Sequence, residues 1–261
     1  MTTPDTPFVI RADDDRGVTT LTLNRPAAFN ALSEGMLTAL QTELEDLARS
    51  QKLRVLVIAA AGKAFCAGHD LKEMRAEPSM DYYQKLFAQC GDMMMRIQKL
   101  QVPVIAKVQG IATAAGCQLV AQCDLAVASA EAKFAVSGVN LGLFCSTPSV
   151  ALSRNLSRKA AFEMLVTGDF LSAQDALKQG LINQIADPSE LDNVLESLVQ
   201  KILAKPPVAL AMGKELFYMQ LETGIEKAYE YAAQTMACNM MDNSALEGVQ
   251  AFIEKRKPNW T

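Results

Sequence analysis

Two glycine-containing turns of this chain could bind a ligand through their backbone N–H groups. They are GKAFCAGHDLKEM, Gly62 to Met74, and KVQGIATAAGCQLVAQCDL, Lys107 to Leu125. Each follows an apolar run, and its small residues leave the N–H groups unobstructed. A helix predicted to begin near Ala115 adds unpaired N–H groups and the positive end of its dipole. If the turns converge, they can form an oxyanion hole, worth about 3–4 kcal/mol per donor when charge develops on a carbonyl oxygen.

The small residues of these turns have a second interpretation, because they also let a helix pack closely on a strand. In that case the turns would have no chemical role. No phosphate-loop or dinucleotide fingerprint accompanies them, so the pattern alone favours the packing role.

One side chain in these turns has an unperturbed pKa near neutrality. His69 is the only histidine of the chain, and histidine is the side chain whose unperturbed pKa lies near neutrality. It lies between Gly68 and Asp70, where a catalytic or substrate-orienting role and a structural role are both open. No suitably spaced thiol or imidazole accompanies His69, so we predict no metal site. The chain also lacks the G-x-S-x-G motif of a nucleophilic serine.

The composition predicts one large globular domain, or a main domain with a small appendage. The chain has 261 residues, of which 50% are apolar and 21% charged, and its net charge is −4. These values exclude collagen-like and disordered classes and weigh against nucleic-acid binding. The longest apolar run, Val55 to Ala61, is much shorter than the roughly 20 residues of a membrane-spanning helix. We therefore expect no nucleic-acid and no membrane partner.

The cysteines indicate the kind of cellular compartment in which the protein is located. Six of them are scattered through the chain without a C-x-x-C pair. The acidic first segment, MTTPDTPFVIRADDD, has no hydrophobic stretch of signal-peptide length. Because free thiols commonly act as small apolar core residues in reducing compartments, we predict a reduced, cytoplasmic protein.

The elements that must position the turns are strands in the first half of the chain and helices in the second. Continuous runs rich in Val and Ile suit strands covered on both faces in a layered α/β architecture, and we predict strands over 18–23, 54–60, 102–108 and 124–128. Apolar spacing predicts helices over 32–47 and 80–100, besides the one near residue 115. After Pro148 we predict helices over 156–166, 172–179, 190–204, 208–221, 225–240 and 244–255.

Along nearly its whole length the chain resembles the crotonase (enoyl-CoA hydratase/isomerase) superfamily. Six segments carry the resemblance in the family's order. They are TLTLNRPAAFNAL from Thr20, GKAFCAGHDLKEM from Gly62, GIATAAGCQLVAQCDL from Gly110, FAVSGVNLGLFCSTP from Phe134, LVTGDFLSAQDALKQGLIN from Leu165 and AFIEKRKPNW from Ala251.

The resemblance implies an α/β fold, the crotonase-like spiral of ββα units with a C-terminal helical trimerisation lobe. We expect residues 1–190 to form the spiral core with an acyl-CoA site and residues 191–261 to form the helical oligomerisation lobe of a homotrimer or hexamer. It also implies an acyl-CoA thioester as the bound partner, with CoA as part of the substrate and no separate cofactor. By matching position, the backbone N–H groups of His69 and Ala115 would stabilise an enolate on the thioester oxygen.

The same resemblance implies residues that bind CoA. Ala67 and Lys72 match positions that hold the adenine and phosphates, and Ala28 falls at the entrance of the CoA groove. Phe252 and Lys255 match C-terminal groups that reach the CoA of a neighbouring subunit. The other charged residues of the run 254–257 are equally consistent with a solvated surface.

Two departures from the family pattern concern the glutamates with which its hydratases position water and transfer protons. Gln118 stands at the first position and Gly138 at the second. Gln118 can hold a water molecule but cannot exchange a proton near neutral pH, and Gly138 has no side chain. General acid–base catalysis contributes about 10²–10⁴-fold per group, so hydration by the usual route should be severely impaired.

Cys145 is a candidate substitute for the missing glutamates. It lies with Ser146 on the loop after Gly142, where some branches of the superfamily place their catalytic group. A thiol could donate a proton to an enolate, and burial or a neighbouring charge would tune its pKa. The alternative is that Cys145 is only packed in the loop.

Three functions remain open. The first is an acyl-CoA enzyme of enoyl-CoA hydratase/isomerase type. The second is a short-chain malonyl-type acyl-CoA decarboxylase, because loss of CO₂ generates an enolate without a base. The AGHD and VNLG segments are similar to such a branch, although that branch has a tyrosine where this chain has Cys145. The third is a non-catalytic acyl-CoA-binding protein.

Overall fold

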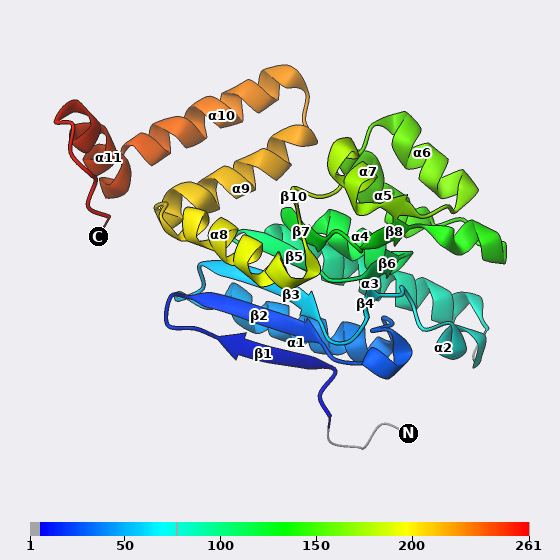
Figure 1. The fold of residues 1–261 in the computed structure, drawn as a ribbon. Coiled ribbons are helices and arrows are strands. Elements are labelled where there is room, and N and C mark those ends of the chain that lie inside the picture. Colours follow the sequence, from blue (N-terminus) through cyan, green and yellow to red (C-terminus); the bar gives the residue numbers. More distant parts are fainter. Residues whose placement is uncertain (1–5, 77, 261) are drawn as a thin grey trace.

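The structure, a computed structural model, describes residues 6–76 and 78–260. Its centre is a six-stranded sheet with the order β1-β2-β3-β5-β7-β10 (Figure 1). β1 and β2 form an antiparallel pair, and the other neighbours are parallel. The strands are β1 Val9–Asp13, β2 Val18–Leu23, β3 Val55–Ala60, β5 Val104–Val108, β7 Leu125–Ser129 and β10 Gln184–Ala186.

A second, four-stranded sheet has the order β4-β6-β8-β9. Its strands are β4 Ala64–Cys66, β6 Ile111–Thr113, β8 Lys133–Ala135 and β9 Leu171–Ser172. Three times along the chain, a strand of the first sheet is followed by a short strand of the second sheet and then by a helix. These units are β3-β4-α2, β5-β6-α4 and β7-β8-α5, with α2 Leu71–Ala76, α4 Ala115–Gln122 and α5 Ser146–Asn155. The predicted α/β spiral of ββα units is thereby confirmed.

The six-stranded sheet is covered on both faces, as its continuous apolar runs predict. In β3, Leu56 and Ile58 belong to the main core, which also contains the apolar faces of α1, Glu34–Ala48, and α3, Met80–Lys99. The alternate residues Val55 and Val57 lie in a second cluster with residues of α8, Leu191–Leu203. The alternation follows from the two-residue period of a strand.

The C-terminal part of the chain consists of three helices, the last two of which lie away from both sheets (Figure 1). They are α9 Pro207–Leu221, α10 Ile225–Met240 and α11 Asn243–Ile253, and neither α9 nor α10 has a buried residue among those described. The division of the chain at residue 190 stays a prediction. Because α8 packs on the central sheet, the extended segment itself begins only after this helix.

A buried ion pair joins α9 to the sheet. Lys214 Nζ donates to Asp124 Oδ2 at 2.6 Å and to the carbonyl oxygens of Ile97 at 3.1 Å and Val102 at 2.9 Å. The hydroxyl of Tyr218 donates to the other oxygen of Asp124 at 2.6 Å. Burial lowers the pKa of Lys214, and the carboxylate of Asp124 opposes this shift.

The remaining helices of the core are α6, Arg158–Thr167, and α7, Ala173–Gln179. Ser172 caps α7 by accepting a hydrogen bond from the Asp175 N–H at 3.1 Å. Within residues 6–76 and 78–260, no helix is long and apolar enough to cross a membrane. In the same part of the chain, no three His, Cys, Asp or Glu residues gather as a metal ion would require.

Candidate functional site

The two glycine-containing turns are in direct contact. A Cβ atom added to Gly68 would lie 2.8 Å from Cβ of Ala114 and 3.2 Å from N of Ala115. A Cβ on Gly116 would lie 2.1 Å from the carbonyl oxygen of Cys66. Gly68 also has φ of +88°, a conformation that favours glycine. The backbones of the turns can therefore meet only because Gly68 and Gly116 lack side chains.

The backbone N–H of His69 points away from Leu32, the residue of the neighbouring segment with which His69 is paired. Leu32 N–H donates to the Gly68 carbonyl at 2.7 Å, and Asp70 N–H donates to the Leu32 carbonyl at 3.4 Å. Leu32 and His69 form a parallel bridge through these bonds. In such a bridge the central residue directs its own N–H to the opposite side, so the N–H of His69 is not used by Leu32.

The second N–H group belongs to Ala115, the first residue of α4. The N–H groups in the first turn of a helix have no partner within the helix. The preceding residue, Ala114, has φ of +51°, which is strained for alanine and is characteristic of functional turns. Its N–H donates to the Ala135 carbonyl at 2.9 Å, and its carbonyl accepts from Gln118 N–H at 3.0 Å. These bonds hold the start of α4 against Gly68.

Two amide side chains, of which that of Asn30 is buried, brace the first turn. Asn30 Nδ2 donates to the carbonyls of Ala61 and Ala64, at 2.8 and 2.9 Å. Gln109 Nε2 donates to the carbonyls of Ala60, Gly62 and Ala64, at 2.9 to 3.1 Å. Sequence reasoning missed both residues; Asn30 has φ of +55°, and an asparagine in a turn is the available signal.

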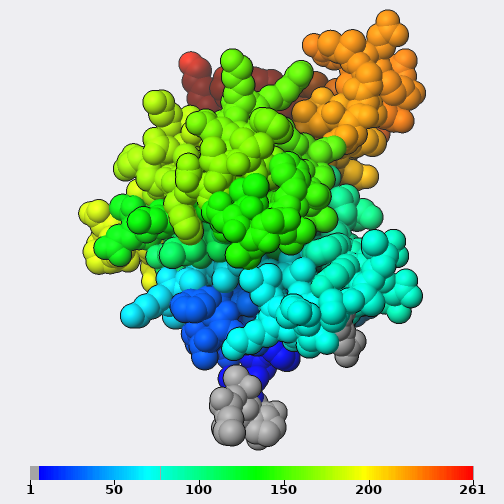
Figure 2. Space-filling view, turned by 90° about the vertical axis from the view of Figure 1, so that its right-hand side faces the viewer, coloured from blue at the N-terminus to red at the C-terminus, as the bar shows by residue number. Residues whose placement is uncertain are grey.

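A cavity of about 300 Å³ opens beside the contact between the turns. Figure 2 views the face on which the green segments, with the loop 137–148, lie above the cyan segments, with residues 67–87. Half of the residues proposed for the site line this cavity: Ala67, His69, Ala115, Gly138 and Cys145.

Apolar side chains that sequence reasoning missed form much of the remaining lining: Leu71, Met74, Phe87, Leu141, Leu143 and Phe144. Three of them fall in the short segment LGLF, whose glycine follows a helical turn. Apolar residues in a loop are the signal that could have identified this wall. No described residue of the lining is an Asp, Glu, Lys or Arg.

His69 is neutral in this environment. Its ring meets the ring of Phe87 edge to face, with 5.4 Å between the centroids. Within the described chain its Nε2 atom is buried without a hydrogen-bond partner. Burial lowers the pKa of His69 to about 4. At neutral pH the side chain can therefore exchange a hydrogen bond with a ligand but carries no charge.

This shift predicts a pH dependence of stability. Above pH 6.5 His69 is neutral in both the folded and the unfolded chain. Between pH 6.5 and 4 the His69 imidazole takes up a proton only in the unfolded chain. The free energy of unfolding should therefore fall by about 3 kcal/mol over this window as the pH is lowered. Urea titrations between pH 4 and 8 give the free energy of unfolding of the unaltered chain and of His69→Gln, and the difference between the two at each pH measures this effect. A difference that is the same at every pH would contradict the prediction.

Gly138 and Cys145 lie against each other. A Cβ at Gly138 would lie 2.5 Å from the carbonyl oxygen of Leu143 and 2.7 Å from Sγ of Cys145. The Gly138 N–H donates to this sulfur, and burial raises the pKa of the Cys145 thiol. The thiol and the loop thus fill the space of a side chain at position 138, so a glutamate fits there only if the loop moves.

The other predicted residues do not line the cavity. Gln118 is 5% exposed, and its Oε1 has no hydrogen-bond partner among the described residues. Lys72 is exposed on α2, where its N–H donates to Asp70 Oδ1 at 3.0 Å, and Ala28 is half-buried. Phe252 is 85% exposed and, with Lys255, lies at the far end of the molecule, on and just after α11 (Figure 1).

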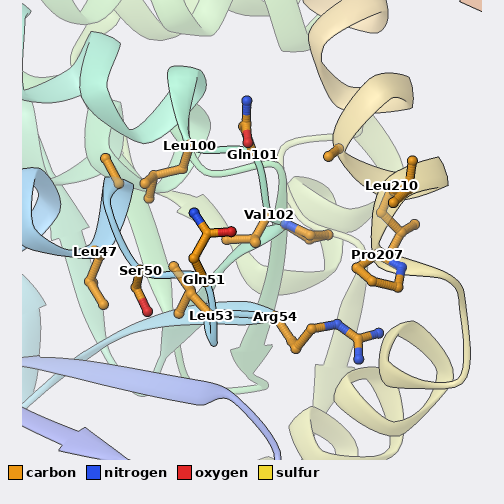
Figure 3. A pocket seen from close by; sticks show the side chains of 14 residues that line it. Leu47, Ser50, Gln51, Leu53, Arg54, Leu100, Gln101, Val102, Pro207 and Leu210 are labelled. Carbon is orange, nitrogen blue, oxygen red and sulfur yellow. The ribbon is translucent and has the colours of Figure 1, made fainter. Parts of the chain in front are cut away.

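A second cavity of about 290 Å³ lies between the ends of α1 and α3 and the start of α9 (Figure 3). Its cationic residue is Arg54. The guanidinium donates to the carbonyls of Leu203 at 3.3 Å and Lys205 at 2.8 Å. Arg54 therefore satisfies the C-terminal end of α8, and this cavity contains none of the predicted site residues.

Comparison with known proteins gives several similar chains. The human "Enoyl-CoA hydratase domain-containing protein 3, mitochondrial" is 45% identical over 245 residues, 94% of this chain and 81% of the relative. Its crystal structure has a TM-score of 0.93 at 44% identity, covering 98% of this chain and 100% of that one. A crystal structure of an enoyl-CoA hydratase from Mycobacterium smegmatis has a TM-score of 0.97 at 66% identity, covering 98% and 99%.

These names contradict the prediction of a cytoplasmic protein. The relatives from rat, mouse, Xenopus laevis and human are all named mitochondrial. The prediction was wrong because it relied on the cysteines. All six are free and five are buried, which is consistent with a reducing environment but does not distinguish one reducing compartment from another.

The family model described as enoyl-CoA hydratase/isomerase matches residues 13–261, nearly the whole chain. The resemblance found in the six sequence segments is confirmed. This chain belongs to the enoyl-CoA hydratase/isomerase family.

Proposed function

We propose that this protein is an acyl-CoA thioester enzyme of enoyl-CoA hydratase/isomerase type. The thioester oxygen binds between the backbone N–H groups of His69 and Ala115, which stabilise the enolate. The observation that supports this most is the contact of Gly68 with Ala114 and Ala115, because it brings the backbones of the two turns together beside a cavity that both His69 and Ala115 line. Two such donors lower the barrier by about 3–4 kcal/mol each when charge develops on the oxygen.

Proton transfer in this site has to use weak groups. Gln118 and Gly138 supply no carboxylate, and the neutral His69 and protonated Cys145 are the titratable side chains of the cavity lining. His69 can accept a proton only weakly, and the Cys145 thiol is a weaker acid than an exposed one. Because each acid or base group is worth about 10²–10⁴-fold, we expect slow hydration and an easier reaction where the enolate forms without a base.

Decarboxylation of a short malonyl-type thioester is the second candidate function. It is supported by the absence of carboxylates from the described cavity lining and by the filled space beside Gly138. The bond between C2 and the carboxylate breaks, its electron pair forms the enolate, and CO₂ leaves. Only the oxyanion donors and a later proton donor are needed for this step.

The test is a product panel. Purified protein is incubated with crotonyl-CoA, a 3-enoyl-CoA and methylmalonyl-CoA, and the products are identified by mass spectrometry. Gain of water or a moved double bond supports the first function, and loss of CO₂ supports the second. Thermal stabilisation by the thioesters without any product would contradict both in favour of a non-catalytic binder.

We further propose a homotrimer or a hexamer built from trimers. Apolar side chains of α9 and α10 are exposed in the single chain, among them Phe217 at 55% and Met236 at 71%. Patches of this kind on a soluble protein mark interfaces. Phe252 and Lys255, which are remote from the chain's own cavity, would reach the CoA of a neighbour.

The proposed assembly predicts the mass of the protein in solution and a lower mass for variants of its subunit interface. Light scattering after size exclusion should give at least three times the chain mass, and Phe217→Asp with Met236→Asp should shift the protein towards the monomer, because a buried unpaired charge is costly. The matched control is Phe162→Asp on α6, also exposed, at 61%. A monomer for the unaltered chain at micromolar concentration would contradict the assembly.

A further inference from the structure

Large apolar side chains surround the mouth of the cavity. Leu71, Leu141, Leu143 and Phe144 line it, yet they are 54%, 69%, 47% and 43% exposed. We name these four residues the rim. Exposed apolar residues that adjoin a cavity mark a ligand-binding surface more often than isolated ones do. The rim is therefore the natural continuation of the cavity towards solvent.

The rim is a fixed part of the fold. Gly142 N–H donates to the Val139 carbonyl and Leu143 N–H to the Gly138 carbonyl, both at 3.0 Å. Ser146 N–H donates to the Phe144 carbonyl at 2.8 Å. These bonds fix the backbone of the loop while its leucine and phenylalanine side chains stay exposed. A ligand would cover them without a prior rearrangement of the loop.

The cavity and rim carry no formal charge at neutral pH. No acidic or basic side chain belongs to the described lining apart from His69, which burial keeps neutral. A carboxylate at the end of a bound acyl chain would therefore lose water without gaining a cationic partner. A hydrocarbon chain has no charge whose hydration would be lost, and removing its apolar surface from water favours binding.

We propose that the rim binds the outer part of the acyl chain, so that the site prefers thioesters with uncharged hydrocarbon chains of about six to ten carbons over short or carboxylated ones. The inference rests on the proposed function, because that function places the thioester group at His69 and Ala115. The four-carbon chain ends inside the cavity, and each further methylene group lies against the rim. The preference concerns binding and favours the first candidate function, because the malonyl-type thioester of the second is both short and carboxylated.

The test measures dissociation constants of the full protein for butyryl-, hexanoyl- and octanoyl-CoA by calorimetry. These saturated thioesters have no double bond to hydrate. A methylene group that is half covered by the rim strengthens binding about twofold, so octanoyl-CoA should bind about 15-fold more tightly than butyryl-CoA. Leu141→Ser with Leu143→Ser should reduce this ratio to about fourfold or less. Phe162→Ser, an equally exposed residue outside the cavity, should keep it.

A second comparison tests charge. Glutaryl-CoA and pentanoyl-CoA have acyl chains of the same length, and the carboxylated one should bind at least about tenfold more weakly. Equal binding of this pair, or affinities that do not change from four to eight carbons, would overturn the inference and leave the proposed function standing. Failure of every thioester to bind would overturn the proposed function itself. Rim variants that change the oligomeric state but not the affinity ratio would make the rim a subunit contact, which also overturns the inference.

Discussion

Asp124→Ala should lower the free energy of unfolding by about 4 kcal/mol. The carboxylate is 14% exposed and accepts hydrogen bonds from Lys214 Nζ, Tyr218 and the Val104 N–H, each at 2.6 Å. Its removal leaves the 7% exposed Lys214 ammonium without a counter-charge. Breaking a buried pair from one side costs about 3–5 kcal/mol. Because α9 has no buried apolar residue that anchors it, the loss should also loosen this helix. Guanidinium unfolding followed by circular dichroism measures the loss.

The controls separate the buried pair from ion pairs in general. Glu230→Ala breaks the exposed pair between Lys227 and Glu230, with side chains 56% and 66% exposed, and should change stability by less than about 1 kcal/mol. Lys214→Met in the Asp124→Ala background should recover part of the loss, because it removes the uncompensated charge. Equal effects of Asp124→Ala and Glu230→Ala would show that burial of the pair does not matter.

Much of the fold could be predicted from the sequence because its long elements carry strong patterns. The apolar runs before each turn became β3 and β5, and the spacing of leucines from residue 32 predicted α1. The short strands β4, β6 and β8 have only three residues each. Three residues show no period, so these strands are defined by pairing with each other, which a local pattern does not contain.

The helix α5 was missed for a different reason. Its segment STPSVALSRN contains Pro148, and a proline in a sequence suggests a boundary between elements. Pro148 is the third residue of the helix, where the N–H of a first-turn residue needs no partner within the helix. The proline therefore fits at the beginning of α5 and marks a start instead of a break.

Half of the site residues predicted from the sequence line the cavity. Ala67, His69 and Ala115 are close to their turns in the chain, so a correct prediction of the turns places them at the cavity. The space beside Gly138 is different, because the Leu143 carbonyl and the Cys145 thiol fill it only after the loop has folded back. Packing of this kind depends on tertiary structure, and residue types alone do not reveal it.

Gly68→Ala should reduce kcat/KM by about 100-fold on whichever thioester the product panel identifies. The new Cβ would lie 2.8 Å from Cβ of Ala114 and 3.2 Å from N of Ala115, so the two turns must separate by a few tenths of an ångström or more. Both proposed oxyanion donors then move relative to the substrate, and a misplacement of about 1 Å costs about 10²-fold. Stability should fall by about 2 kcal/mol, from the left-handed backbone and from overpacking together.

Gly180→Ala is the matched control, because it separates backbone strain from the contact of the turns. Gly180 also has φ of +88°, but an added Cβ would meet only the Asn155 carbonyl oxygen, at an ordinary 3.5 Å. This variant should lose about 1 kcal/mol of stability and keep its activity. If both variants keep their activity, the contact at Gly68 does not set the position of the donors. If both lose it equally, the loss follows strain anywhere in the core, and only a loss confined to Gly68→Ala ties the reaction to the junction of the two turns.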